Sequence, residues 1–471
     1  MENSVKNISN DKKDKFLYFF LFIIVFCIIQ FSPSFLEILQ PDSFSYINNS
    51  DYRKSLYSLI IQSLDFLNFD LFLFQKIILT SSLISIFYAL RFQKIRFIYC
   101  FFFILIVSIN AYYTSFTKTI LTEALFFSFI NFSIALFLLK ERNSNFLYFL
   151  SGLSFGFLFS IKSVGMVLGL IFLLVLLIFQ LRDKKFKSII IIFTGFLIFP
   201  TTEYHYFYSK NKERSSVLPL SILGKIFIIS GSDSFNYLKF PTESHELLDT
   251  ASKISKGIKQ SMESMKNPYL KFELSSDYEV LAQYQILKGE INKINEKYRK
   301  NSEVYKQKDH KVLLNEIGII MLKEYPLEYA KISFSHYIGL WSMGAKQIFL
   351  ENYLMKADKK LPFLEMIELS DNKYNSLDRL FQISVFVFFL FLFLFFSILT
   401  LFTFFVLIKT RNPKKDFLLE LFIFSAQSYL IAIAFTNIAI PRYFIAIYPI
   451  IIVSLIMISD DLISFIKKKL Y

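Results

Sequence analysis

The stretch FLYFFLFIIVFCIIQFSPSF, residues 16–35, decides the fold class of this chain. It is almost wholly apolar and about as long as a helix must be to cross a hydrocarbon core of about 30 Å. A helix satisfies its own backbone hydrogen bonds in lipid, so the run predicts a membrane-spanning helix. No small-residue cleavage site follows it, which predicts a retained signal anchor and not a removed signal peptide.

Composition extends this prediction to the whole chain. Of the 471 residues, 54% are hydrophobic and only 19% are charged, and the mean hydropathy is +0.46. A soluble domain carries about 25% charged residues. The sequence therefore predicts an all-α polytopic membrane protein with about ten transmembrane helices. The expected spans are 16–35, 71–90, 97–113, 121–139, 146–161, 166–181, 188–204, 379–408, 417–436 and 443–458.

The net charge of +14 is concentrated in short loops between these runs. Such loops hold Arg91, Lys94 and Arg96; Lys140 and Arg142; Arg182, Lys184, Lys185 and Lys187; Lys409, Arg411, Lys414 and Lys415; and Lys467, Lys468 and Lys469. Basic loops lie on the cytoplasmic side, so both termini are expected there, in a multi-pass protein of the plasma membrane. The charges are explained by topology and lipid headgroups, and no nucleic-acid partner is expected. Cys27 and Cys100 fall inside apolar runs, with neither a disulfide framework nor metal-ligand spacing.

Hydrophobicity divides the chain into three parts. Residues 1–204 form a transmembrane module with a first outer loop at 36–70, residues 205–378 form a polar, mainly helical extracytoplasmic domain, and residues 379–471 return to the membrane. Within the outer loop, helical spacing predicts an amphipathic helix on the membrane surface. The residues that carry this spacing are Leu56, Leu59, Ile60, Ser63, Leu64 and Leu67.

One carboxylate follows the first span directly, in QPDSFSY at residues 40–46. Charges beside lipid are costly to keep, so Asp42 is a candidate functional residue. The short outer loops add Lys118, Glu123, Lys162 and Arg442, each at the end of a predicted span. Three cations on the outer face oppose the positive-inside bias, which predicts a compensating anion.

Each of these charges also has a structural interpretation. Lys118 and Lys162 could extend to the outer headgroups, with their apolar stems along the helix ends. Glu123 could form a structural ion pair with Lys118 or act in catalysis. Arg442 is the stronger candidate for an anion, because a guanidinium matches phosphate oxygens with two hydrogen bonds.

A carboxylate beside several cations suits the transfer of a sugar from a lipid phosphate. The acceptor hydroxyl needs a base, and the departing phosphate needs positive charge. Asp42 is the expected base, and Arg442 and Lys162, with Lys118 beside them, are the expected phosphate-binding residues.

Five short motifs occur in an informative order. They are PDSFSY at 41–46, LTEALFF at 121–127, SIKSVG at 160–165, YPLEYAKISFSHYIGLW at 325–341 and PRYFIAIYPIII at 441–452. Their order and sidedness resemble the GT-C superfamily of integral membrane glycosyltransferases, in particular bacterial relatives of the dolichyl-phosphate-mannose-protein mannosyltransferases, glycosyltransferase family 39.

The resemblance implies a polyprenyl-phosphate-linked sugar donor, a lipid, glycan or protein acceptor, and a catalytic acid in the first outer loop, which places that role on Asp42. Tyr46, Tyr443 and His336, which belong to three of the motifs, are expected to line the substrate pocket. Many relatives carry two adjacent acids where this chain has Asp42 and Ser43, so Asp51 or Glu123 is left to supply a second carboxylate.

The chain departs from the family at a second position. SIKSVG stands where Arg-Pro is more usual, which makes Lys162 a weaker phosphate ligand. No cofactor is firmly expected. A divalent cation stays open, although hard cations need several oxygen ligands.

Three other functions fit a multi-span protein. An O-antigen polymerase or ligase also has one large outer loop and acts through basic residues in it. A lipid-linked oligosaccharide flippase or other transporter would carry charges near the membrane midplane and show repeat symmetry. The third is a non-catalytic membrane scaffold.

Overall fold

A computed structural model gives the structure of this chain. It describes residues 2–34, 36–40, 42–51, 53–139, 144–182, 184–210, 225, 228–263, 310–342, 415–436 and 441–470. Within these ranges the regular structure is helical, and no strand occurs. The predicted all-α class is therefore confirmed for this part of the chain. The expected span 379–408 and most of the expected outer domain lie outside the described residues.

Contacts along the chain define two compact units. The first unit contains Met1–Ser215, Leu399–Tyr429 and Ile445–Tyr471. The second contains Ser216–Ile398 and Leu430–Phe444.

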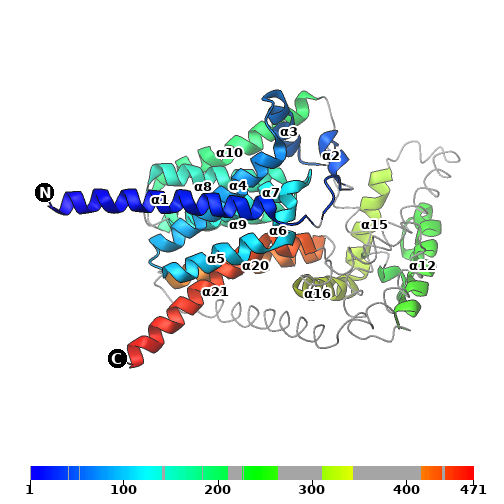
Figure 1. The fold of residues 1–471 in the computed structure, drawn as a ribbon. Helices are drawn as coiled ribbons and strands as arrows, with labels where there is room; N and C mark the ends of the chain where they lie inside the picture. The colour runs from blue at the N-terminus through cyan, green and yellow to red at the C-terminus, as the bar shows by residue number, and fades with distance from the viewer. Residues whose placement is uncertain are drawn as a thin grey trace. The chain divides into compact units, whose positions relative to one another are not determined.

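A bundle of helices forms the first unit, and its part Met1–Ser215 is coloured from blue to green in Figure 1. The long helices of this part are α1 (Glu2–Phe31), α4 (Leu71–Phe92), α5 (Phe97–Ile109), α7 (Glu123–Leu138), α8 (Asn145–Ile161), α9 (Gly165–Arg182) and α10 (Phe186–Ser209). Helix α4 packs against α1, α5 and α7, and α8 packs against α7, α9 and α10. These helices coincide with the apolar segments between residues 16 and 204, because an apolar run must satisfy its backbone internally.

Three helices in the described residues are long and apolar enough to cross a membrane: Leu71–Phe92, Phe186–Ser209 and Arg442–Asp460. A bent pair, Phe97–Ile109 with Ala111–Lys118, raises this number to four if it counts as one span. Other apolar helices are shorter. Helix α7, for example, has 16 residues, and a helix rises about 1.5 Å per residue, so α7 is shorter than a hydrocarbon core of about 30 Å.

The predicted span 97–113 is not one straight helix. The chain breaks at Asn110, and the helices on either side are bent by 59°. The Asn110 backbone is extended there, and its side-chain oxygen accepts a hydrogen bond from the Tyr113 backbone N–H at 3.1 Å. An asparagine in this position caps a new helix, α6 (Ala111–Ser115), which a 3-10 turn, η1 (Phe116–Lys118), continues.

Several helices extend beyond their predicted ends. Helix α1 begins at Glu2, within the polar tail, and α10 continues past Tyr204 to Ser209. Helix α21 (Pro441–Leu470) continues beyond Ile458. Asp460 on that extension accepts a hydrogen bond from the Arg96 guanidinium at 2.7 Å, which joins α21 to the start of α5 within the first unit. The predicted ends were placed where hydropathy falls. The helices extend further because polar residues can also adopt helical structure.

Glycines set the contact between α8 and α10. A Cβ atom on Gly152 would lie 2.0 Å from the Ile192 carbonyl oxygen, and one on Gly156 would lie 2.2 Å from that of Phe196. On the facing helix, a Cβ on Gly195 would lie 2.3 Å from the Phe149 carbonyl oxygen. Small residues four positions apart allow membrane helices to approach at backbone distance. Helices α8 and α10 are therefore fixed against each other.

The predicted first outer loop contains two helices, α2 (Ser43–Ile47) and α3 (Leu56–Phe66). They lie at one end of the bundle, where α3 contacts α4, α8 and α10 (Figure 1). Helix α3 confirms the helix predicted from the spacing of its leucines, and Leu56 and Leu64 are buried. Leu67, which follows α3, is 68% exposed.

In the second unit, α12 (His245–Glu263) contacts two short turns, Tyr237–Lys239 and Thr242–Ser244, and α15 (His310–Glu324) contacts α16 (Pro326–Ser342). Lys225 is buried in this unit and donates hydrogen bonds to the Ser333 hydroxyl and the Ala434 carbonyl. Helix α20 (Lys415–Thr436) contributes its C-terminal residues to the same unit.

Candidate functional site

Asp42 immediately precedes α2, at the end of the bundle that holds α3. Its carboxylate does not cap α2. It instead forms an ion pair with the Arg53 guanidinium, 2.6 Å from Nη2 to Oδ1. The side chains of Asp42 and Arg53 are 26% and 24% exposed, so the pair is open to solvent on one side. Asp42 therefore has a charged partner and is still accessible to solvent.

Arg53 is a residue that the sequence analysis missed. Its Nε donates to the Ser45 hydroxyl at 3.1 Å, and its guanidinium lies over the Tyr46 ring, 5.2 Å from the ring centre. Both contacts orient the Arg53 guanidinium toward Asp42. The sequence did carry a signal, because Arg53 is a cation in a predicted outer loop and violates the same bias that drew attention to Lys118, Lys162 and Arg442.

Tyr46 supports this ion pair from the protein interior. It is 3% exposed, and its ring packs edge-on against Tyr57 at 5.4 Å between centres. Its hydroxyl is hydrogen-bonded to the Thr122 side chain. Burial raises the pKa of Tyr46 to about 12, although Arg53 lowers it. Tyr46 thus stays a neutral hydroxyl at physiological pH.

Glu123 and Lys162 form a second ion pair. Lys162 Nζ is 2.6 Å from Glu123 Oε1, and the two side chains are 10% and 1% exposed. The Thr122 hydroxyl donates to Glu123 Oε2 at 3.2 Å. Glu123 begins α7 and Lys162 follows the last residue of α8, so each charge also faces the helix end that favours it.

This geometry corrects one expectation. Glu123 pairs with Lys162, which is 39 residues away, and not with Lys118. Lys118 lies on η1 and donates to the Ser32 carbonyl, which anchors the end of α1. Lys162 is one-tenth exposed and is paired inside the bundle, so it does not extend to headgroups as the alternative interpretation required.

A third buried charge, Glu203 on α10, was also missed. Glu203 is 4% exposed, and its Oε1 accepts a hydrogen bond from the Ser55 backbone N–H at 2.9 Å. Ser55 immediately precedes α3. The signal was again present in the sequence, because Glu203 is an acid inside the predicted span 188–204, where an ionisable group is costly.

Contacts connect these residues into one network. Arg53 forms an ion pair with Asp42 and lies over the Tyr46 ring. The Tyr46 hydroxyl is hydrogen-bonded to the Thr122 side chain, which donates a hydrogen bond to Glu123. Glu123 in turn binds Lys162. The network therefore runs from a solvent-accessible carboxylate to a buried ion pair, across α2, α7 and the end of α8.

Arg442, Tyr443 and His336 belong to the second unit. Tyr443 and His336 are 5% and 1% exposed, and the Arg442 guanidinium lies 5.7 Å from the centre of the Tyr443 ring. The phosphate-binding role of Arg442 and the substrate-pocket roles of Tyr46, Tyr443 and His336 stay predictions.

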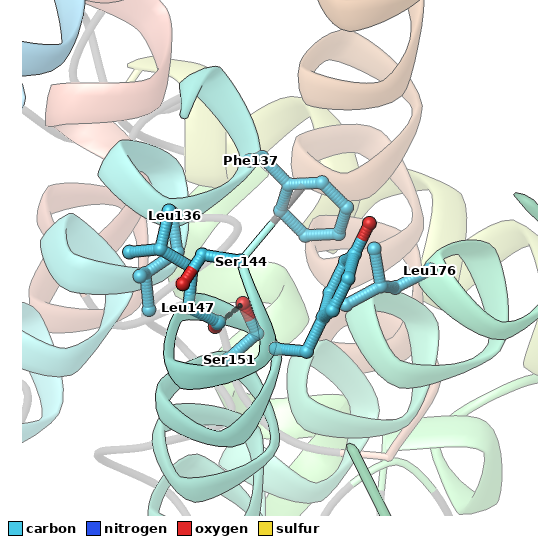
Figure 2. Close-up of a pocket in the computed structure, with 7 residues that line it drawn as sticks. Leu136, Phe137, Ser144, Leu147, Ser151 and Leu176 are labelled. Atoms are coloured by element: carbon cyan, nitrogen blue, oxygen red, sulfur yellow. Dashed lines mark hydrogen bonds between the residues drawn. The ribbon is translucent and has the colours of Figure 1, made fainter. Parts of the chain in front are cut away.

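A pocket in the first unit lies at the opposite end of α7 and α8 (Figure 2). Its lining consists of Leu136, Phe137, Ser144, Leu147, Tyr148, Ser151 and Leu176. None of these residues is charged, and the Ser151 hydroxyl donates to the Leu147 carbonyl within α8 at 2.8 Å. The pocket adds no reactive group to the network around Asp42.

The divalent cation that the sequence left open stays a prediction. Asp42 and Glu123 each have a side-chain cation at 2.6 Å. Within the ranges that the structure describes, no three or more His, Cys, Asp or Glu side chains converge to hold a metal.

Comparison with family models, curated proteins and solved structures gave no match.

Proposed function

We propose that the protein is an integral membrane glycosyltransferase of the GT-C type. In this proposal it has about ten membrane helices, both termini in the cytoplasm and the segment 205–378 outside. It transfers a sugar from a polyprenyl-phosphate-linked donor to a lipid, glycan or protein acceptor at the extracytoplasmic face of the plasma membrane. The motif order gave the hypothesis, and the accessible Asp42–Arg53 pair is the observation that supports it best.

The proposed reaction uses the two members of this pair separately. The acceptor hydroxyl oxygen attacks the anomeric carbon of the sugar and loses its proton to Asp42. The bond from that carbon to the phosphate oxygen breaks, and the polyprenyl phosphate leaves with the electron pair. Positive charge at Arg53 stabilises the negative charge that develops on the phosphate.

Exposure supports Asp42 over Glu123 as the base. A base must come within about 3 Å of the proton that it accepts. Asp42 is 26% exposed, whereas Glu123 is 1% exposed and bound to Lys162. In the proposal Glu123 and Lys162 therefore act as a structural pair beneath the site, and Tyr46 orients Arg53.

Two measurements test the proposal. Purified protein in lipid should consume polyprenyl-phosphate-linked sugars and release polyprenyl phosphate, and deletion of its gene should remove one surface glycan or glycolipid while the unused donor accumulates. Unchanged surface glycans and donor lipids in the deletion strain would contradict it. Accumulation of a complete but unpolymerised glycan unit would indicate the polymerase or ligase instead.

A further inference from the structure

Glu203 supplies a hydrogen bond that α3 lacks from its own sequence. Ser55 precedes α3, but its side chain makes no capping hydrogen bond. The first N–H groups of a helix need acceptors from outside the helix, and buried ones are costly to leave without any. Glu203 Oε1 accepts from the Ser55 backbone N–H at 2.9 Å, although 148 residues separate the two in sequence.

The start of α3 is also tied to α2. The Ser58 hydroxyl donates to the Tyr46 carbonyl at 2.6 Å, and the Tyr57 and Tyr46 rings pack against each other. Ser55, Tyr57 and Ser58 are all buried. The Arg53 guanidinium binds Asp42. Arg53 lies two residues before Ser55, so its backbone is close to the hydrogen bond between Ser55 and Glu203, which we call the anchor of α3.

Helix α10, which carries the anchor, packs closely against α8. Gly152 and Gly156 of α8 hold it at backbone distance, with no space for even one additional carbon atom. Glu203 lies about two turns beyond the last of these contacts, which is at Phe196 of the same helix.

We infer that Glu203 is a positioning residue for the Asp42–Arg53 pair. Its carboxylate holds the start of α3 against α10 and thereby fixes the Arg53 guanidinium on Asp42. The consequence for sugar transfer rests on the proposed function, whereas the effect on Arg53 does not.

Two substitutions of Glu203 separate hydrogen bonding from charge. Glu203→Gln keeps a side-chain oxygen that can accept from Ser55, and Glu203→Leu removes the acceptor at similar size. Thr202→Val is the matched control, because Thr202 is exposed on the same turn and donates only within α10, to the Ile198 carbonyl.

The first readout is independent of any enzymatic activity. Phenylglyoxal labelling of Arg53, followed by mass spectrometry, reports how firmly its guanidinium is held. Hydrogen exchange of the amides at 55–58 reports the start of α3. In Glu203→Leu we expect both rates to rise about tenfold, with Glu203→Gln and Thr202→Val within about twofold of wild type. Unchanged Arg53 labelling in a folded Glu203→Leu protein would overturn the inference.

The second readout is transfer. Misplacing a reacting group by about 1 Å can cost up to about 100-fold, so Glu203→Leu should lower kcat by about 10- to 100-fold with little change in KM, and Glu203→Gln should restore it. A Glu203→Gln protein with normal Arg53 labelling but a kcat as low as that of Glu203→Leu would also overturn the inference, because charge and not position would then matter. If wild type transfers no sugar, the proposed function fails, and Arg53 labelling still decides the role of Glu203.

Discussion

Exposure separates Asp42 and Glu123, which both lie beside cations in the first unit. Asp42 is 26% exposed and bound to Arg53, whereas Glu123 is 1% exposed and bound to Lys162. A carboxylate at the surface can exchange its partner for a substrate at small cost. A buried one cannot give up its partner without leaving a charge in a poorly solvated site. The same chemistry therefore predicts catalysis for the first and stability for the second.

Asp42→Asn tests the catalytic prediction. The amide keeps the shape of the side chain but cannot take a proton at neutral pH, so sugar transfer should fall by about 10²–10⁴-fold. Asp42→Glu should keep part of the activity, because its oxygens are displaced by one methylene. The measurement is release of polyprenyl phosphate by purified protein.

Asp65→Asn is the control for this experiment, since Asp65 is exposed on α3 in the same loop. Its transfer rate should equal that of wild type. Near-normal transfer by Asp42→Asn would exclude Asp42 as the base and direct attention to Glu123.

The buried pair makes a different prediction. Lys162→Met leaves Glu123 as an uncompensated buried charge, which should destabilise the protein by about 3–5 kcal/mol. Glu123→Gln combined with Lys162→Met removes both charges, and most of the lost stability should return. Thermal unfolding of the purified variants in detergent measures both effects. A double variant less stable than Lys162→Met would contradict this account.

At the scale of elements, the glycines of α8 determine where the helix ends lie. Gly156 faces the Phe196 carbonyl oxygen so closely that its own Cβ would lie 2.2 Å from it. Helices α8 and α10 carry Lys162 and Glu203 at the same end of the bundle. Their contact therefore sets the spacing of two charges that support the site.

Gly156→Ala should disrupt this contact, because backbone and not a flexible side chain occupies the space. We expect a lower melting temperature and a free energy of unfolding that is lower by about 1–3 kcal/mol, the usual cost of overpacking. The matched control is Gly257→Ala on α12, where nothing lies within 4 Å of the added Cβ. That variant should be as stable as wild type or gain up to about 1 kcal/mol from helix propensity. Equal stability of the two variants would contradict the packing argument.

At the scale of the whole molecule, sidedness is the property to measure. Lys187 lies in a basic loop that is predicted to be cytoplasmic, and Lys256 lies in the segment predicted to be outside. Both side chains are exposed, whereas the neighbouring Ser255 is only 7% exposed and is a poor labelling position. In a variant without Cys27 and Cys100, an impermeant maleimide should label Lys256→Cys in intact cells and Lys187→Cys only after permeabilisation. Labelling of position 187 alone from outside would invert the topology.

Hydropathy alone was enough to predict an all-helical chain and the positions of several of its helices. An apolar run in lipid has few conformations that satisfy its backbone, so hydropathy located α4, α7, α8, α9 and α10 to within a few residues. It failed where a single polar side chain decides the outcome, as at Asn110, whose capping bond ends α5 and begins a bent helix. The unusual cost of charges near lipid also identified Asp42, Glu123 and Lys162 as worth attention.

Which of these charges form pairs depends on the packing of the helices and could not be predicted from hydropathy. Arg53 and its partner Asp42 are 11 residues apart in sequence, and Lys162 and its partner Glu123 are 39 residues apart. Glu203 is 148 residues from Ser55, the residue that it binds at the start of α3. Charge attraction has no preferred sequence distance, so the pairings depend on how the helices pack. That packing depends on backbone-to-backbone contacts at Gly152 and Gly156, which hydropathy does not record.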